Sequence, residues 1–170
     1  MDAFLAITSK RDVRDYAPWP IPPDVAVRIL DAGRLAGSAR NRQPWRFLVV
    51  ESADLREGLA QAVYAPGNVR DAALVVAIVA GGKGPIDFDC GRAAQNMMLA
   101  AWAEGVASCP NGLADADAAS RLLALDEVER PQIVLSFGYP ARPSDPEGRA
   151  PEEWSRRADR RPLDEIVTTL

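Results

Sequence analysis

The 170-residue sequence contains no histidine. This absence removes the side chain that most often serves as general base, metal ligand or pH switch near neutrality, and it excludes a Ser-His-Asp triad. Cysteine is also scarce: Cys90 and Cys109 form no C-x-x-C pair, which argues against a zinc site or a disulfide framework. We interpret both as reduced thiols. Any enzymatic chemistry is therefore expected to come from a cofactor rather than from side chains or a metal.

Long apolar runs and an excess of positive charge are missing as well. No segment reaches the ~18 apolar residues of a membrane span, and the first residues lack the apolar core of a signal peptide. The net charge of −4 argues against binding to nucleic acid or to an anionic membrane. We therefore expect a cytoplasmic protein with neither kind of partner. Neither G-x-G-x-x-G nor G-x-x-x-x-G-K-[ST] occurs, which disfavours a Rossmann site and a P-loop.

Hydrophobic patterning predicts alternating helices and strands, and hence an α+β or three-layer α/β fold. The uncharged run 93–103 predicts a helix that is buried around most of its circumference. Gly37 is expected to end a separate, earlier helix at 24–36. A polar, proline-rich arm at 141–160 precedes an apolar tail. Helices are expected at 2–9, 24–36, 55–63, 87–105 and from Asp115 or Asp117 to Leu123; strands are expected at 45–50, 73–79, 107–112 and 132–140.

Three basic or polar clusters stand out against the acidic background. Arginine side chains from separate segments can converge on one anion, and a phosphate suits the planar guanidinium fork. Each single arginine could equally be a solvated surface charge, so the combination carries the signal. The clusters are Lys10, Arg11 and Arg14; Arg40, Asn41, Arg42 and Gln43; and Arg156, Arg157, Arg160 and Arg161.

Five segments in order resemble the FMN-dependent nitroreductase family: "SKRDVRDY", "RILDAGRLAGSARNRQPWRFLVV", "AAQNMMLAAWAEGVASC", "LSFGYP" and "RRPLDEIV". The resemblance covers essentially the whole chain, and N-x-QPW-x-F is its most specific element. It implies an α+β, three-layer α/β/α fold with a mixed sheet flanked by helices. It also implies a single domain over residues 1–170, with 142–170 as an extended C-terminal arm and tail, and an intertwined homodimer.

The activity implied by the resemblance is that of an FMN-dependent NAD(P)H oxidoreductase. NADH or NADPH would reduce the flavin and leave, and a small nitroaromatic or quinone-type electron acceptor would then be reduced, with no obligatory catalytic side chain. Two alternatives keep the flavin: a flavin-sequestering protein with little turnover, and a family member specialised for another flavin reaction. Without the resemblance, a generic α/β interaction domain remains.

The resemblance also implies a set of flavin-binding positions. The opening basic motif would hold the phosphate and ribityl chain, with Arg14 beside the pyrimidine edge. Because Pro110 has no N–H, the backbone donor to flavin N5 would be Asn111 or Gly112, with Leu113 touching the ring. The loop 38–41 would approach the flavin of the other subunit. The full set is Lys10, Arg11, Asp12, Arg14, Ser38, Ala39, Arg40, Asn41, Pro110, Asn111, Gly112, Arg160 and Arg161.

Some positions depart from the family pattern. Asp12 stands where serine is usual, and its carboxylate would repel a phosphate unless a neighbouring arginine neutralises it. Only residues 80–87 separate the strand 73–79 from the long helix, so the helical excursion that covers the cleft in many relatives is missing. We expect a more open site, or a lid from another segment such as 142–155. Asn68 and Arg70 are further candidates for contact with the flavin pyrimidine. Trp45 is expected to anchor the following strand, and Met97, Met98 and Trp102 are expected to pack at the dimer interface.

Overall fold

The computed structural model describes residues 1–170, which divide into two compact units. One unit is Arg11–Pro143, and the other combines Met1–Lys10 with Ser144–Leu170. The helices are α1 (Ala3–Ser9), α2 (Pro23–Arg34), α3 (Ala53–Gln61), α4 (Pro66–Arg70), α5 (Ile86–Ala103), α6 (Ala116–Leu122) and α7 (Pro151–Arg157); the 3₁₀ turns are η1 (Ala39–Asn41), η2 (Pro146–Gly148) and η3 (Leu163–Glu165); the strands are β1 (Trp45–Val49), β2 (Leu74–Gly81), β3 (Ala107–Asn111) and β4 (Glu129–Gly138).

The four strands form one sheet in the order β1-β2-β4-β3. All three strand pairings are antiparallel, so the expectation of a mixed sheet is wrong for the strands themselves. The parallel pairing that exists is an isolated bridge between Asp12 and Ser108. It arises because the segment after α1 runs along the free edge of β3.

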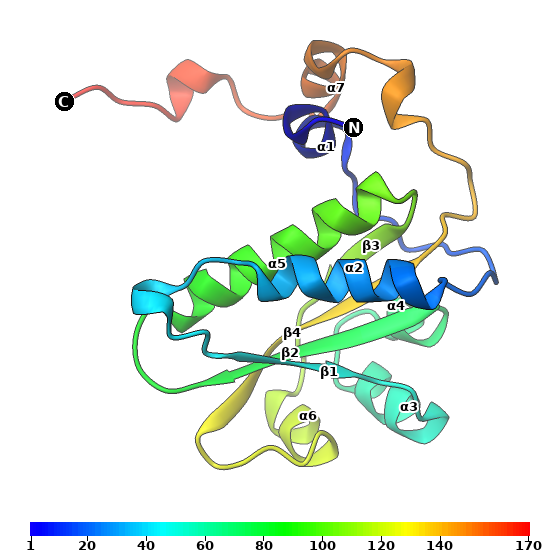
Figure 1. The fold of residues 1–170 in the computed structure, drawn as a ribbon, viewed down its shortest axis with the longest axis vertical. Coiled ribbons are helices and arrows are strands. Elements are labelled where there is room, and N and C mark those ends of the chain that lie inside the picture. Colours follow the sequence, from blue (N-terminus) through cyan, green and yellow to red (C-terminus); the bar gives the residue numbers. More distant parts are fainter. The chain divides into compact units, whose positions relative to one another are not determined.

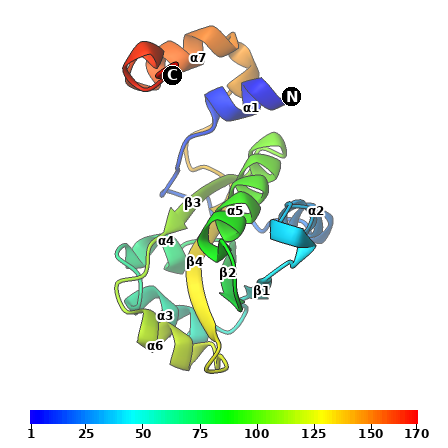
Figure 2. The ribbon, with the colours of Figure 1, turned by 90° about the vertical axis from the view of Figure 1, so that its left-hand side faces the viewer.

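Helices cover both faces of this sheet, which confirms the three-layer α/β/α fold (Figure 1). Helices α2 and α5 lie on one face, and α3, α4 and α6 lie on the other (Figure 2). Two separate hydrophobic clusters fill the spaces between the layers. One cluster contains Ile29, Met97 and Phe137, and the other contains Leu59 and Val69.

Strand β2 is the central strand that the uninterrupted apolar run predicts. Its residues Val75 to Val79 are all 0% exposed because both faces of the strand are covered by helices. Successive side chains of β2 enter opposite clusters: Val76 belongs to the α2–α5 side and Ala77 to the other. The strand therefore ties the two cores together.

Helix α5 is buried on one face only, so the prediction of nearly complete burial is wrong for the single chain. Met97 and Trp102 are buried in the chain's own core, while Gln95, Asn96 and Ala103 are exposed. Met97 packs against Gly33 of α2, where a Cβ atom would lie 2.9 Å from the Met97 Cγ. The uncharged run is explained by this close helix packing on one side and by small or neutral polar residues on the other.

Local signals set some helix ends and miss others. Pro23 occupies the first turn of α2, and the Asp115 side chain caps α6 by accepting a hydrogen bond from the Ala118 N–H at 2.8 Å. The predicted end at Gly37 is wrong, because α2 stops at Arg34 and tightens there, with the Ala36 N–H bonded to the Gly33 carbonyl. Helices α4 and α7 were not expected.

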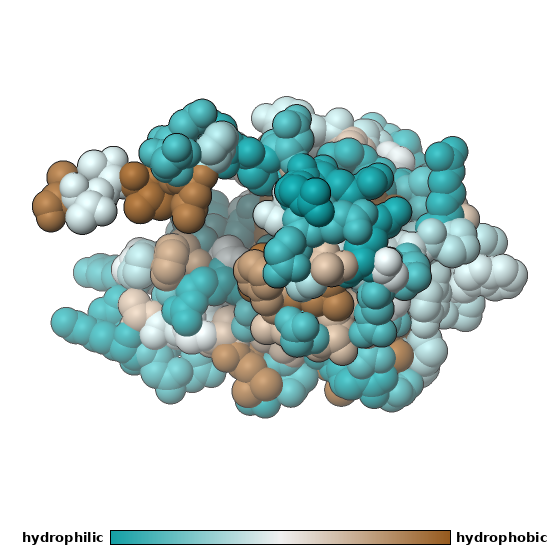
Figure 3. All heavy atoms as spheres, turned by 90° about the horizontal axis from the view of Figure 1, so that it is seen from above, coloured by the Kyte–Doolittle hydropathy of each residue, from teal (hydrophilic) through white to brown (hydrophobic).

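The unit formed by the two chain ends is small and helical. Asp2 caps α1 by accepting from the Leu5 N–H at 2.9 Å, and the Trp154 indole of α7 donates to the Pro146 carbonyl at 2.9 Å. Its last apolar residues are exposed. They are Leu163, Ile166, Val167 and Leu170, which are 52–114% exposed. Figure 3 shows brown, hydrophobic spheres standing at the surface among mainly teal ones. A single domain over residues 1–170, with 142–170 as its C-terminal arm and tail, stays a prediction, because the chain divides into two compact units. None of the helices combines the length and the apolar character that crossing a membrane requires.

Candidate functional site

The basic segment that follows α1 lies against the start of β3. Asp12 forms the parallel bridge with Ser108, and the Val13 N–H donates to the Ser108 carbonyl at 3.1 Å. Tyr16 then bridges to Pro140, just after β4. These backbone bonds fix residues 12–16 as an irregular extension of the sheet edge.

The side chains of this segment divide between core and solvent. Val13 packs on the cluster below α3, α4 and α6, and Tyr16 is 9% exposed. Asp12 and Arg14 are exposed and Arg11 is half-buried. The alternation of an extended chain therefore presents Asp12 and Arg14 to solvent at the edge of the sheet. Arg11, Asp12 and Arg14 are the predicted positions that the sheet edge brings together.

The far end of β3 carries the other predicted group, Pro110, Asn111 and Gly112. Asn111 is 3% exposed, and its amide nitrogen donates to the carbonyls of Cys109 and Val134, each at 3.1 Å. Its side chain is thus directed into the protein. At this end of the strand, a ligand could therefore contact backbone atoms and the Pro110 ring, but not the Asn111 side chain.

A buried polar network connects the two ends of β3. The Asn68 amide of α4 donates to Asn111 Oδ1 at 2.8 Å, and the Asn111 amide also donates to Ser136 Oγ at 3.1 Å. Ser136 Oγ donates to the Cys109 carbonyl at 3.2 Å. The Tyr16 hydroxyl lies 3.0 Å from Ser136 Oγ and donates to the Ser136 carbonyl at 3.3 Å. Burial is the main cause of the raised pKa of Tyr16, which stays protonated.

One buried polar atom is left without a partner at this edge. Ser108 is 1% exposed and its hydroxyl makes no hydrogen bond. Along β3 the side chains of Ser108 and Pro110 point to the face that α5 covers. A cleft of about 350 Å³ lies on that face beside Pro110. Its lining is Asp87, Cys90, Gly91, Ala94, Met98, Pro110, Gln132 and Ile133.

The loop before β1 has a strained backbone. Arg40, Asn41 and Gln43 have φ values of 54°, 54° and 50°, in the left-handed region that costs roughly 1 kcal/mol for most side chains. Two contacts hold this shape: the Gln43 N–H donates to Ser38 Oγ at 2.9 Å, and the Ala39 N–H donates to Asp89 Oδ2 at 3.0 Å. Ser38 and Ala39 thus shape the loop, while the Arg40 and Asn41 side chains are exposed.

The remaining predicted positions belong to the unit formed by the chain ends. Arg160 and Arg161 are exposed, and the Arg160 guanidinium donates to the Ala158 carbonyl at 2.8 Å. Lys10 is the last residue of the N-terminal part of this unit. Their convergence with Arg11 and Arg14 stays a prediction.

The two further pyrimidine candidates have separate surroundings. Arg70 forms an ion pair with Glu57 of α3 at 2.6 Å, whereas Asn68 is 7% exposed within the buried network beside Asn111. Leu113 packs partly on the core. Asn68 is therefore the candidate that lies beside the end of β3.

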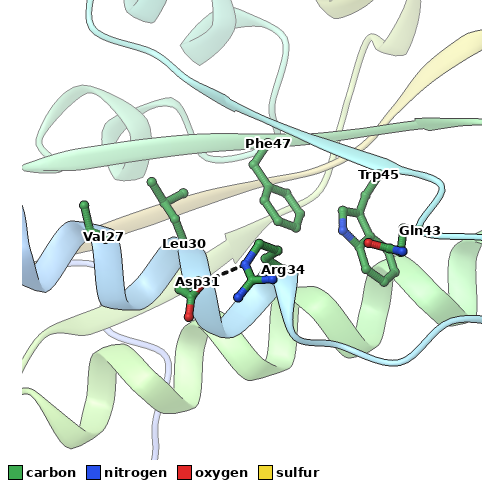
Figure 4. A pocket seen from close by; sticks show the side chains of 7 residues that line it. All are labelled: Val27, Leu30, Asp31, Arg34, Gln43, Trp45 and Phe47. Carbon is green, nitrogen blue, oxygen red and sulfur yellow. Dashed lines mark hydrogen bonds and ion pairs between the residues drawn. The ribbon is translucent and has the colours of Figure 1, made fainter. Parts of the chain in front are cut away.

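A second cleft, of about 530 Å³, lies between α2 and β1 (Figure 4). The rings of Trp45 and Phe47 lie side by side with centroids 6.2 Å apart, and Arg34 pairs with Asp31 at 2.6 Å on the α2 side. Trp45 also packs on the α2–α5 cluster, as predicted. None of the predicted flavin-binding residues lines this cleft.

Sequence reasoning missed four polar or aromatic residues at this site: Asp89, Ser108, Ser136 and Tyr64. Ser136 is a polar residue within an apolar segment, a signal that indicates a buried partner. Asp89 lies between Asp87 and Arg92 and carries no such signal. Tyr64 lies beside Gly112, to which its N–H donates. Nothing local in the sequence marks Ser108 as unpartnered.

The fold and the edge of β3 define a class: a three-layer α+β protein with a basic segment along one sheet edge and a glycine just after the edge strand. The model of the family described as "Nitroreductase family" matches this chain over residues 7–83 and 81–139. The chain belongs to the nitroreductase family.

Curated relatives agree in name. A protein named as a candidate NADH dehydrogenase/NAD(P)H nitroreductase of Methanothermobacter thermautotrophicus is 30% identical over 150 residues, covering 83% of this chain and 78% of its own. A protein of the same name from Archaeoglobus fulgidus is 31% identical over 144 residues, covering 79% of this chain and 83% of its own. These names support an oxidoreductase.

Solved structures share the fold over the full chain. A nitroreductase family protein of Clostridium difficile superposes with a TM-score of 0.83 at 26% identity and covers 100% of both chains. A candidate nitroreductase of Desulfovibrio desulfuricans, solved in complex with FMN, superposes with a TM-score of 0.81 at 28% identity, covering 100% of this chain and 98% of its own.

Proposed function

We propose that this chain is an FMN-dependent NAD(P)H oxidoreductase that reduces a nitroaromatic or quinone-type acceptor in two half-reactions. The observation that carries the proposal is the edge of β3. The basic segment lies along the start of this strand, and the backbone of Asn111 and Gly112 lies at its end. Family membership and the FMN complex of the Desulfovibrio desulfuricans relative support the choice of cofactor.

The residues present at this edge fit FMN. From Ser108 to Asn111 the strand spans about 10 Å, comparable to the five-carbon chain that separates the phosphate of FMN from its ring. Arg11, next to the residue that bridges to Ser108, offers a charge at one end of that span. At the other end, Gly112 has no side chain to obstruct a planar ring.

Each residue has one proposed role. Lys10 and Arg11 bind the phosphate and ribityl chain, joined by Arg160 and Arg161. Arg14 places positive charge at the pyrimidine edge, where it favours reduction. The N–H of Asn111 or Gly112 donates to flavin N5, and the Pro110 ring packs against the cofactor. Bound FMN supplies the hydride chemistry, which is why no histidine is needed.

The remaining assignments complete a homodimer. The exposed face of α5 and the exposed apolar tail are the surfaces that a second copy of the chain would cover. Ser38, Ala39, Arg40 and Asn41 would then face the partner's flavin. Asp12 would sit beside the phosphate with Arg11 and Arg14 as neutralising neighbours.

The first test is the visible spectrum of the purified protein before and after anaerobic addition of NADH or NADPH. Rapid bleaching of a flavin spectrum is the expected result. A flavin spectrum that persists would indicate sequestration instead of turnover. A colourless protein that takes up no added FMN would overturn the proposal.

A matched pair of variants tests the site. Arg14→Gln removes a charged hydrogen-bond donor and is expected to weaken FMN binding about 10-fold or more, since such bonds contribute about 1.5–3 kcal/mol. Arg121→Gln removes an exposed arginine from α6 and is expected to leave binding unchanged. Quenching of FMN fluorescence measures both dissociation constants, and equal effects of the two variants would contradict the assignment.

A further inference from the structure

The connection between α3 and α4 presents one aromatic ring to solvent. Tyr64 is 78% exposed, yet its backbone is fixed, because its N–H donates to the Gly112 carbonyl at 3.1 Å. The preceding residue, Val63, bridges to Leu113. Exposed aromatic side chains are common on protein surfaces, so the meaning of this one depends on where the backbone holds it.

The ring of Tyr64 lies directly beside Gly112. A Cβ atom at Gly112 would be 3.3 Å from Tyr64 Cδ2 and 3.6 Å from Cε2. Glycine therefore lets the ring approach the backbone more closely than another residue would. The ring and the backbone after β3 form one continuous surface.

The elements on either side of Tyr64 are held in place. Arg70 of α4 forms a bidentate pair with Glu57 of α3, at 2.7 and 2.6 Å. Asn68 ties α4 to Asn111 at the end of β3. The ring thus stands on a connection that is held at both ends, so the position of its Cα atom relative to Gly112 is fixed.

The connection between β2 and α5 is short. Strand β2 ends at Gly81 and α5 begins at Ile86, so four residues join them. Two of these, Gly82 and Gly84, have φ values of 104° and 121°. This turn has no aromatic side chain to present to a ligand.

We propose that Tyr64 stacks on the planar electron acceptor and sets the preference for aromatic and quinone acceptors over non-planar ones. The inference rests on the proposed function, in which Gly112 belongs to the backbone that meets flavin N5. An acceptor must reach N5 to receive hydride, and a ring in contact with Gly112 flanks that approach. Aromatic stacking favours flat π-systems over compact inorganic ions.

The test compares the full-length holoprotein with Tyr64→Ala, Tyr64→Phe and Tyr64→Leu. Trp19→Ala, which removes another exposed aromatic ring, is the matched control. The first readout is equilibrium binding of 4-nitrobenzoate to the oxidised holoprotein without reductant, followed by the change in flavin absorbance. The second is KM for 4-nitrobenzoate and for ferricyanide at fixed NADH. The third is the dissociation constant for FMN.

Tyr64→Ala is expected to raise the dissociation constant and KM for 4-nitrobenzoate about 3- to 10-fold, with ferricyanide and FMN binding unchanged. Tyr64→Phe keeps the ring and is expected to match the wild type within about twofold, whereas Tyr64→Leu keeps apolar bulk and is expected to resemble Tyr64→Ala. Trp19→Ala is expected to change none of these values. Should Tyr64→Ala fail to fold, the Leu and Phe variants carry the same comparison.

Unchanged 4-nitrobenzoate binding in Tyr64→Ala, or an equal rise in KM for both acceptors, would overturn the role of Tyr64 while leaving the proposed function intact. A raised dissociation constant for FMN would make Tyr64 a flavin contact and would overturn the proposal as well. A wild-type protein that takes up no FMN fails at the earlier step and overturns both proposals.

Discussion

Single residues with buried polar atoms define how rigid the edge of β3 is. Ser136 is 0% exposed, and its one hydroxyl serves Tyr16, Asn111 and the Cys109 carbonyl together. A buried network with all members paired specifies a single arrangement, because each broken bond leaves an unpaired polar group in a low-dielectric interior. Asn111 is thereby held with its backbone at the strand end and its side chain in the core.

Ser136→Ala is expected to lower the free energy of unfolding by about 0.5–1.5 kcal/mol, because the hydroxyl's hydrogen bonds are lost while the Asn111 amide keeps the Cys109 and Val134 carbonyls and the Tyr16 hydroxyl keeps the Ser136 carbonyl. Urea denaturation followed by circular dichroism measures the change. The control, Ser155→Ala, removes an exposed hydroxyl on α7 and is expected to change stability by less than about 0.5 kcal/mol. Equal effects would show that the network contributes no stability.

Cys90 is expected to resist alkylation. Burial, followed by the nearby carboxylates of Asp87 and Asp89, raises the pKa of its thiol to about 11. At pH 8 only about one thiol in a thousand is then the reactive thiolate. In a Cys109→Ser background, mass spectrometry after iodoacetamide treatment should find Cys90 unmodified in the native protein and modified in urea. Rapid labelling of the native protein would contradict the buried, protonated thiol.

Between elements, the loop 38–43 and helix α5 are joined through one carboxylate. Asp89 is 3% exposed and lies in the first turn of α5, where the helix dipole favours a negative charge. It accepts the Ala39 N–H and so holds the turn whose residues have positive φ. The strain of the loop is offset by this contact and by the bond from Gln43 to Ser38.

Asp89→Ala is expected to loosen the loop, so that trypsin cleaves more readily after Arg40 and Arg42, whose side chains are already exposed. The variant leaves the Ala39 N–H without its acceptor, which costs about 1–3 kcal/mol. Limited proteolysis should show faster cleavage after these arginines than in the wild type. Asp54→Ala, at an exposed position in α3, serves as the control. Unchanged cleavage in Asp89→Ala would contradict the role of Asp89.

The pair between α3 and α4 makes a pH-dependent contribution. The hydrogen bond from Arg70 lowers the pKa of Glu57 from 4.5 to about 2. Because the folded-state pKa is depressed, the stabilisation is fully present above pH 4.5 and disappears as the pH falls towards 2. The pair is exposed, so salt should weaken it.

Glu57→Gln provides the measurement. Thermal midpoints of wild type and variant are expected to differ most above about pH 5 and to converge near pH 2, with a smaller difference in high salt. A difference that stays constant across this range would show that the ion pair is not its source.

The whole molecule leaves apolar surface that its own core does not use. The tail residues Leu163, Ile166 and Val167 are 52–72% exposed, and Phe88 on the outer face of α5 is 67% exposed. Exposed apolar surface of this kind marks an association site. The proposed dimer accounts for it with a second copy of the same chain.

Deleting residues 163–170 is expected to weaken the dimer without unfolding the unit Arg11–Pro143, since the removed side chains are exposed. Size-exclusion chromatography with light scattering measures the mass, and circular dichroism measures the fold. The control is Asp164→Ala with Glu165→Ala, which keeps every apolar residue of the tail. A mass unchanged by the deletion over a dilution series would argue against a role for the tail.

Much of the fold was predictable because its signals are local. The apolar run that became β2, the periodicity of α2, the capping Asp115 and the motif order that places the chain in its family are all readable along the sequence. Helix α4 was missed because Pro66, Gly67 and Asn68 are poor helix formers, and its short helix is held by Asn68 and Arg70 contacting residues outside it.

The candidate site was predictable only in part. Motif resemblance indicated Arg11, Arg14 and the strand end at Asn111, but not the partners that hold them. The bonds that join Asn68, Asn111, Ser136 and Tyr16 connect residues separated by up to 120 positions. No periodicity encodes such pairs, because they form only when separate strands and helices are brought together.

By itself, the sequence determined the composition limits, the positions of the main helices and strands and the family, because these depend on neighbouring residues and on motifs in order. The tertiary structure alone decided the antiparallel sheet, the one-sided burial of α5, the strained loop held by Asp89 and the place of Tyr64 beside Gly112. These features depend on contacts between distant segments, and the physical reason is that side-chain burial and hydrogen-bond pairing are properties of the packed chain.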